Sequence, residues 1–248
     1  MSILAKLKLQ TTPAGKKLFG VITGLRLAGK STLAGTLPGK TLMLQASVLE
    51  SGSESAKTLA ARNKNNLDVV SFSNNAELLA VLKELTEDTE YDNVFVDSLT
   101  AITEQKSKEP EIVKLTKGNG FAAYKEIGVS AIDIIEKLKE LTYPGKAKKP
   151  KNTWITCALK IKSDVNGNVT DVDLETRGQM AIAAVTKYGE AVVTVVGPQR
   201  TEQGMGAHAL ITKTTELWPG RIDGLLADQN PGKLEPADLS AVLKLLNL

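Results

Sequence analysis

The residues with the clearest chemistry lie between Gly24 and Thr32, which read GLRLAGKST. Two glycines allow backbone N–H groups to turn inward and approach an anion closely. The ammonium group of Lys30 can bridge the outer phosphates of a nucleotide, and the Ser31 hydroxyl can ligate Mg²⁺. The spacing G-x-x-x-x-G-K-[ST] predicts a phosphate-binding loop rather than a glycine-rich turn with a surface lysine. The predicted nucleotide-binding residues are Gly24, Leu25, Arg26, Leu27, Ala28, Gly29, Lys30, Ser31 and Thr32.

Phosphate transfer also needs carboxylates, one near Mg²⁺ and one that positions water. Asp97 ends the apolar segment NVFVDS, and ligands of α/β sheets lie beyond the carboxyl ends of strands. We therefore expect Asp97 to hold Mg²⁺ through water, together with Ser31; the alternative is that Asp97 caps the following helix. Glu50 is the preferred candidate for positioning water, beside the catalytic Lys30, and Glu54 is the second. For both glutamates the alternative is a solvated loop.

The elements that must position these residues alternate between apolar runs and helical stripes. This alternation predicts an α/β fold with a mainly parallel central sheet flanked by helices. After residue 161, short β segments and an Asn-Gly turn predict a more antiparallel β extension. We expect one domain over residues 1–248, with a core at about 18–161 and a β-rich part at about 162–248. The predicted core strands are Leu18–Thr23, Lys40–Gln45, Leu67–Phe72, Asn93–Ser98 and Asn152–Ile161, and the predicted helices include Ser31–Leu37, Ser53–Asn63, Asn74–Leu85 and Phe121–Thr142.

Composition restricts the function classes. The net charge is only +3, so any nucleic-acid binding must come from local patches. The one cysteine, Cys157, lies in an apolar run, which predicts a packed core thiol, excludes an intramolecular disulfide and suits a reducing cytoplasm. With one histidine, His208, a structural zinc site is not expected. We expect no signal peptide and no membrane span, because no apolar run is long enough.

The order of the parts resembles the RecA-like recombinase core of P-loop ATPases. The matching motifs are ITGLRLAGKSTLAGTLPGK, an acidic ESG loop, YDNVFVDSLTAITE, a long helix and ITCALK, within Leu18–Ile161. The chain is similar to small phage versions, which are single-strand annealing or recombination-mediating ATPases, and WPGRIDGLLADQNPGK resembles their tail. One feature departs from the family: its second strand usually ends in Asp-x-Glu, whereas Gln45-Ala46-Ser47 stands here. Glu50 would then take the catalytic role from three residues further on.

The resemblance implies an ATPase that uses ATP and Mg²⁺ and assembles as a ring or filament on single-stranded DNA. It also implies a cytoplasmic location, that of the host if phage-encoded, and admits a single-strand binding protein as partner. Two loops would face the DNA, Gln105–Gly120 and Lys162–Val172, with the first the more basic. Acidic residues in the first loop and few aromatic residues leave a solvated loop as the alternative. The predicted DNA-binding residues are Lys106, Lys108, Lys114 and Lys117.

A second basic stretch, Pro144–Asn152, is interpreted first as a surface loop and only second as a DNA contact. By resemblance, a basic residue from a neighbouring subunit completes the nucleotide site. Arg221 is preferred over Lys213 and Arg200, because Pro219-Gly220 precedes it and Asp223 can orient its guanidinium. The alternative for Arg221 is a surface ion pair with Asp223.

Two other function classes stay open at this point. The first is a nucleotide-binding assembly protein with little or no turnover, which the displaced glutamate would suit. The second is a small-molecule P-loop kinase, which would need a basic lid and a substrate pocket. The sequence contains no compact arginine cluster for such a lid, so the kinase ranks last.

Overall fold

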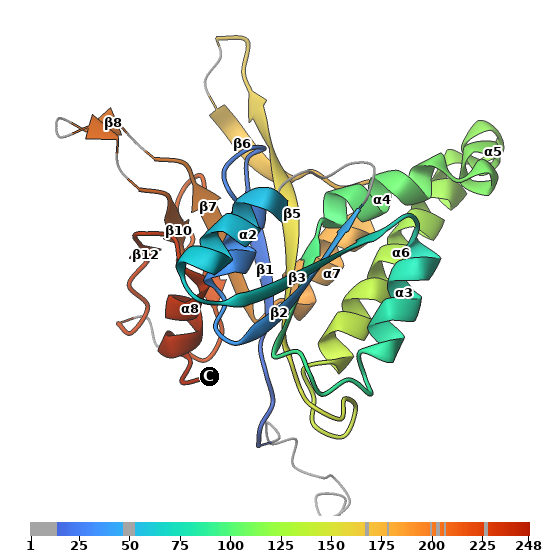
Figure 1. Ribbon diagram of the computed structural model, residues 1–248. Helices are drawn as coiled ribbons and strands as arrows, with labels where there is room; N and C mark the ends of the chain where they lie inside the picture. Colours follow the sequence, from blue (N-terminus) through green and yellow to red (C-terminus); the bar gives the residue numbers. More distant parts are fainter. Residues whose placement is uncertain are drawn as a thin grey trace, which may run out of the picture.

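A ten-stranded sheet organises the chain (Figure 1). The computed structural model describes residues 14–46, 53–166, 169–177, 179–198, 200–201, 204–205, 207–225 and 228–248. The strand order is β12-β10-β7-β1-β5-β4-β2-β3, with β6 paired to β5 and β11 paired to β7. The strands are β1 (Phe19–Gly24), β2 (Lys40–Ala46), β3 (Asn66–Phe72), β4 (Asn93–Asp97), β5 (Asn152–Ser163), β6 (Val169–Leu174), β7 (Ala191–Val196), β10 (Ala209–Ile211), β11 (Arg221–Ile222) and β12 (Lys233–Leu234). A separate two-stranded sheet pairs β8 (Arg200–Thr201) with β9 (Gly204–Met205).

Helices cover both faces of this sheet (Figure 1). The alternation of side chains along β1 shows why, since Phe19 and Val21 enter one core whereas Leu18 and Ile22 enter the other. The first core lies under α3, α4, α6 and α7, and the second under η1, α2 and α8. The helices are η1 (Ser31–Thr36, a 3₁₀ helix), α2 (Ser53–Arg62), α3 (Asn75–Glu84), α4 (Leu99–Lys108), α5 (Pro110–Gly118), α6 (Gly120–Glu140), α7 (Gln179–Tyr188) and α8 (Leu239–Leu245).

The predicted fold class is confirmed. Six strands run parallel to their neighbours, from β3 through β2, β4, β5 and β1 to β7. The strands β10 and β11 pair antiparallel with β7, and β12 pairs antiparallel with β10, which is the predicted antiparallel extension. The strand β7 had been grouped with that extension, but its pairing with β1 is parallel. Within the described part of the chain, no helix is both long and apolar enough to cross a bilayer.

The segment expected to be the first DNA-facing loop, Gln105–Gly120, is helical. Glu109 has extended backbone and Pro110 begins α5, where a missing N–H costs nothing. Asn119 is extended again, and its side chain accepts a hydrogen bond from the N–H of Ala122 at the start of α6. We call α4, α5 and the beginning of α6 the helical arm; α5 lies at its tip (Figure 1).

The second expected loop, Lys162–Val172, has regular structure in Lys162–Ser163 and Val169–Val172. These residues belong to β5, which continues past the sheet, and to β6, which pairs antiparallel with it. Cross-strand charges favour the pairing, since the Nζ of Lys162 lies 2.8 Å from Asp171 and 3.4 Å from Asp173. The hairpin rises from the carboxyl end of the sheet, at the top of Figure 1.

Candidate nucleotide site

The phosphate-loop motif lies at the carboxyl end of β1, where the chain turns back over the sheet. Gly24 has a φ of +155°, and a Cβ added there would stand 2.7 Å from the carbonyl oxygen of Val195. Gly29 has a φ of +90° and Leu27 a φ of 64°, with the Leu27 side chain fully exposed. Only glycine adopts the first two conformations at low cost. Both glycines of the motif are therefore required by the backbone, and η1 begins directly after Lys30.

The ammonium group of Lys30 folds back over the loop. Its Nζ donates hydrogen bonds to the carbonyl oxygens of Gly24 at 3.1 Å and Leu25 at 2.8 Å. These carbonyls hold the cation above the loop opening. Phosphate oxygens, which are stronger acceptors because they are charged, would draw it away from them.

Asp97 is the buried carboxylate of the site, with 1% of its surface exposed. Its Oδ1 accepts a hydrogen bond from the Thr156 hydroxyl on β5, the strand between β4 and β1. Its Oδ2 is buried and has no hydrogen-bond partner among the described residues. The capping role falls to Ser98, whose hydroxyl oxygen accepts from the N–H of Ala101 at 3.1 Å.

A buried carboxylate oxygen with no partner is costly unless a cation or donor satisfies it. Asp97 and Ser31 line the same cavity, and both supply the hard oxygen ligands that Mg²⁺ prefers. The residues present therefore fit a magnesium ion bound through water. The cavity holds about 600 Å³. It is lined by Arg26, Leu27, Gly29, Lys30, Ser31, Thr32, Ser55, Asp97, Ser98, Thr100, Ala101, Glu104 and Ala158.

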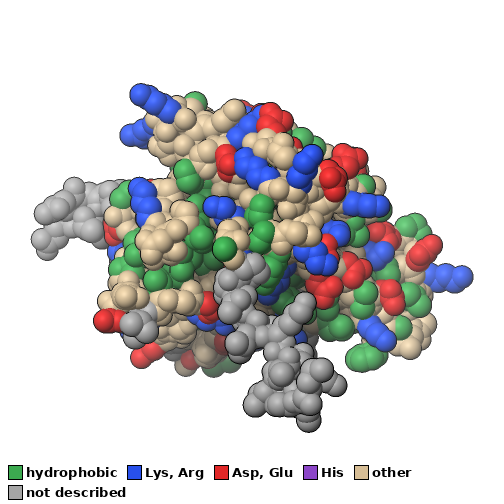
Figure 2. All heavy atoms as spheres, turned by 90° about the horizontal axis from the view of Figure 1, so that it is seen from below, with side chains coloured by type: hydrophobic (Ala, Val, Ile, Leu, Met, Phe, Trp, Pro, Cys, Tyr) green, Lys and Arg blue, Asp and Glu red, His purple; other side chains and the backbone are tan. Residues whose placement is uncertain are grey.

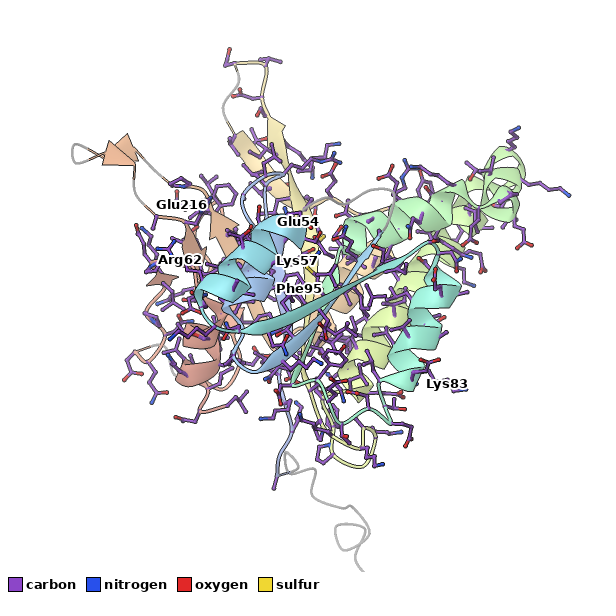
Figure 3. All side chains as sticks on the ribbon, viewed as in Figure 1. Glu54, Lys57, Arg62, Lys83, Phe95 and Glu216 are labelled. Atoms are coloured by element: carbon purple, nitrogen blue, oxygen red, sulfur yellow. The ribbon has the colours of Figure 1, made fainter. Side chains whose placement is uncertain are left out.

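Neither predicted water-positioning glutamate is placed in this cavity by the structure. Glu50 lies outside the described residues. Glu54 stands in the first turn of α2 with 82% of its side chain exposed, and it pairs with Lys57 at 3.1 Å (Figure 3). Its neighbour Ser55 lines the cavity, whereas Glu54 does not. Both assignments stay predictions.

The predicted DNA-binding lysines divide into two pairs. Lys106 forms an ion pair with Glu109, and Lys108 with Glu104 at 2.9 Å, so nearby carboxylates compensate both charges. Lys114 and Lys117 are exposed on α5, and Lys117 lines a groove there. The helical arm thus has more positive charge available at α5 than on α4.

The second basic stretch, Pro144–Asn152, lies at the opposite, amino end of the strands. Lys149 pairs with Asp92 at 2.7 Å, and Lys151 is fully buried. Figure 2 views the molecule from below and shows positive and negative side chains interspersed over that face. These contacts favour the surface-loop interpretation of the stretch over a DNA contact.

Two of the candidate basic residues for a neighbouring subunit, Arg221 and Lys213, do not line the cavity. Arg221 pairs in register with Val192, near the amino end of β7, and its Nε lies 2.9 Å from Asp223. The Arg221 guanidinium also donates to the Gly189 carbonyl. Lys213 is exposed just after β10, and the side chain of Arg200 is outside the described residues. The ion pair with Asp223 is compatible with both interpretations of Arg221, as a residue that completes the site of a neighbouring subunit and as a surface ion pair.

Sequence reasoning missed several contacts around the cavity. Thr156 was passed over as part of an apolar strand, although a polar residue in a buried strand is a usable signal. Thr100 accepts a hydrogen bond from the N–H of Ala158 at 3.0 Å, which ties α4 to β5. Arg26 is held by both carboxylate oxygens of Glu175, at 3.1 and 2.8 Å, a pairing of distant residues that no local pattern predicts.

Cys157 is buried on β5, as predicted for a core thiol. Burial raises the pKa of this thiol to about 12. The thiolate, which is the nucleophilic form, is therefore scarce at neutral pH, and a catalytic role for Cys157 is excluded.

Comparison with known proteins agrees with the site geometry. No curated protein matches the chain. A family model described as AAA domain matches residues 16–222, which include the phosphate loop, Asp97 and the sheet from β1 to β11. The chain therefore belongs to the AAA domain family, within the P-loop ATPase superfamily.

Proposed function

We propose that this P-loop ATPase domain hydrolyses ATP with Mg²⁺ and assembles on single-stranded DNA, in phage recombination or strand annealing. The observation that carries the nucleotide part is the cavity lined by Lys30, Ser31 and Asp97, together with the Asp97 Oδ2, which has no partner among the described residues. Family membership implies nucleotide use, usually with Mg²⁺. The DNA and recombination parts rest on the RecA-like order of motifs and on the surface of the helical arm.

Each residue of the cavity has a role in this function. The loop N–H groups from Gly24 to Thr32 would hold the phosphates, and Lys30 would leave its loop carbonyls to bridge the outer two. Mg²⁺, when bound, neutralises the charge of the outer phosphate oxygens. Thr156 holds one oxygen of Asp97, a residue that lines the cavity. Leu33 and Ala34 anchor the start of η1 in the core, which keeps Ser31 in place.

The helical arm has the chemistry expected of a single-strand contact. Phe121 is 82% exposed and Tyr124 54% exposed, although large aromatic side chains are usually well buried. Tyr124 lines a groove of about 240 Å³ together with the cations Lys117 and Arg177. We call this the α5 groove, lined by Ser107, Val113, Thr116, Lys117, Ala123, Tyr124, Ile127 and Arg177.

Exposed rings beside cations fit nucleic acid because bases stack on the rings while lysines neutralise phosphates. No carboxylate lines the α5 groove among the described residues. The low aromatic content of the sequence argued against a stacking surface, but the exposed rings of Phe121 and Tyr124 supply one. Self-association into a ring or filament would place many such grooves along one strand, and a single-strand binding protein would then be a natural partner.

The deciding experiment measures ATP hydrolysis with and without single-stranded DNA. Wild-type protein should hydrolyse ATP, and DNA should raise the rate. Nucleotide binding with no turnover under either condition would favour the assembly protein instead. Phosphate transfer to a small acceptor, with no effect of DNA, would favour the kinase.

A matched pair of variants tests the DNA part. Replacing Phe121 and Tyr124 with alanine should weaken single-strand binding by about tenfold or more, since stacking contributes about 1–3 kcal/mol per base. The control is Leu217→Ala, which removes another exposed apolar side chain outside the groove. Equal DNA affinity in both variants would place the DNA path elsewhere.

A further inference from the structure

The phosphate cavity has a second carboxylate that the sequence motifs did not identify. Among the described residues that line it, only Asp97 and Glu104 are acidic. Thr100, Ala101 and Glu104 follow one another at helical spacing on α4, so one face of that helix forms the cavity wall.

Glu104 stands at the far end of this wall from Asp97. It follows the capping residue Ser98 by about 9 Å along the helix axis, at 1.5 Å per residue. The cavity thus has a carboxylate residue at each end of this wall, with Thr100 and Ala101 between them. Arg26, from the phosphate loop, lines the same cavity and acts electrostatically on Glu104.

The surroundings of Glu104 keep it ionised. Lys108 forms an ion pair with it at 2.9 Å, one turn further along α4. The hydrogen bond from Lys108, followed by the fields of Arg177 and Arg26, holds the pKa of Glu104 below its ordinary value. The side chain is one-third exposed, so solvent water reaches it.

Two other described glutamates near the loop, Glu175 and Glu54, do not line the cavity. Glu175 is held bidentately by Arg26 and does not line the cavity. Glu54 faces solvent from α2, where it pairs with Lys57. Glu104 is therefore the described glutamate that lines the cavity.

We propose that Glu104 is the catalytic residue that positions the attacking water, a role that rests on the proposed ATP hydrolysis. The water oxygen attacks the γ-phosphorus while Glu104 accepts one of its protons. The bond from the γ-phosphorus to the bridging oxygen breaks, and its electron pair stays on ADP. Products are ADP and phosphate, and the proton on Glu104 passes to solvent, which restores the carboxylate.

The test compares Glu104→Gln with Glu109→Gln. Both changes remove a glutamate that pairs with a lysine near the end of α4, but Glu109 does not line the cavity. Glu104→Gln should lower kcat by at least about a hundredfold, the scale of a lost general base. Its affinity for a fluorescent ATP analogue should stay within about twofold of wild type, because ground-state contacts are kept.

The same measurement on Glu50→Gln decides between the two assignments. Normal turnover by Glu104→Gln, with slow turnover by Glu50→Gln, would overturn the role of Glu104 and leave ATP hydrolysis intact. An equal loss of kcat in Glu104→Gln and Glu109→Gln would also overturn it, because the loss would then come from disturbing the end of α4 and not from a group in the cavity. Wild-type protein that binds ATP but never hydrolyses it would instead overturn the proposed function, and with it this role.

Discussion

A charged side chain is buried at each end of the parallel sheet, but only at the amino end does every polar atom of its charged group have a partner among the described residues. At the amino end, Lys151 is fully buried, and its Nζ donates to the carbonyl oxygens of Asp88 at 2.7 Å and Lys149 at 3.0 Å. It also lies 3.4 Å from the Asp88 carboxylate. At the carboxyl end, Asp97 is equally buried but has one oxygen with no described partner.

This difference separates a structural charge from one that awaits a ligand. The chain supplies every group that Lys151 needs, so the amino end is complete by itself. The carboxyl end holds an Asp97 oxygen with no partner among the described residues, and the cavity that Asp97 lines is also lined by Lys30. Folding alone does not satisfy that oxygen, and a divalent cation is the kind of group that would.

The largest effect should come from the loop lysine. Lys30→Ala should lower ATP hydrolysis by at least about a hundredfold, because it removes a cation aimed at the developing phosphate charge. The melting temperature without nucleotide should stay near that of wild type, because the Lys30 side chain lines the cavity and belongs to neither hydrophobic core. A folded variant with wild-type nucleotide affinity and turnover would refute the phosphate-loop assignment.

The second effect contrasts the two buried charges directly. Lys151→Met should lower the free energy of unfolding by about 2 kcal/mol or more, since Asp88 and two carbonyls lose their partner. Asp97→Asn should change it by about 1 kcal/mol or less, because the carboxylate it removes is only half satisfied.

Urea unfolding with and without Mg²⁺ and an ATP analogue measures both. Ligands should stabilise wild type and Lys151→Met by a similar amount, and Asp97→Asn much less. Equal ligand stabilisation of all three proteins would show that Asp97 does not serve the metal.

The phosphate loop and Asp97, at the carboxyl end of the sheet, were easier to predict from the sequence than the segments that connect the strands. The phosphate loop and Asp97 were predictable because local spacing fixes a strand, a turn and the residue that ends a strand. Glu104 was not assigned to the site, because a DNA-facing loop was expected from Gln105 onward, where α4 in fact continues to Lys108. Its approach to Arg26 depends on how α4 packs beside β5, which no local pattern encodes.

Side-chain partners across the fold were the other gap. The pairing of Arg26 with Glu175 joins residues far apart in the sequence, and the burial of Lys151 runs against its exposed-loop composition. Lysine is almost never fully buried unless paired, so a lysine run gives no warning of it. Only the packed structure shows which charges of a basic stretch remain available to a ligand.

The third effect concerns DNA and the helical arm. Lys114 and Lys117 lie on α5, whereas carboxylates already compensate Lys106 and Lys108. If both α5 lysines contact phosphates, replacing them with alanine should flatten the log–log salt dependence of single-strand binding by about 1.4, at 0.7 per contact. The matched double variant at Lys106 and Lys108 should flatten it less. The reverse order would place the DNA path along α4, and no change in either would remove the arm from it.

The smallest effect is a partial return of activity on mixing two variants, and it tests whether the amino end is complete within one subunit or serves a neighbour. Arg221 lies there, with Asp223 orienting its guanidinium, and it is exposed enough to reach another copy. We propose that it acts in trans, where a charged planar fork suits the developing phosphate charge. Lys30→Ala and Arg221→Ala proteins, each inactive alone, should then regain about a quarter of the wild-type rate when mixed equally, because random head-to-tail assembly pairs an intact loop with an intact arginine at that frequency. Wild-type activity in Arg221→Ala alone would show that Arg221 has no role in hydrolysis and only forms a surface ion pair with Asp223. Failure of every mixing ratio, with co-assembly shown by sedimentation, would exclude Arg221, and Lys213 and Arg200 would be tested in the same way.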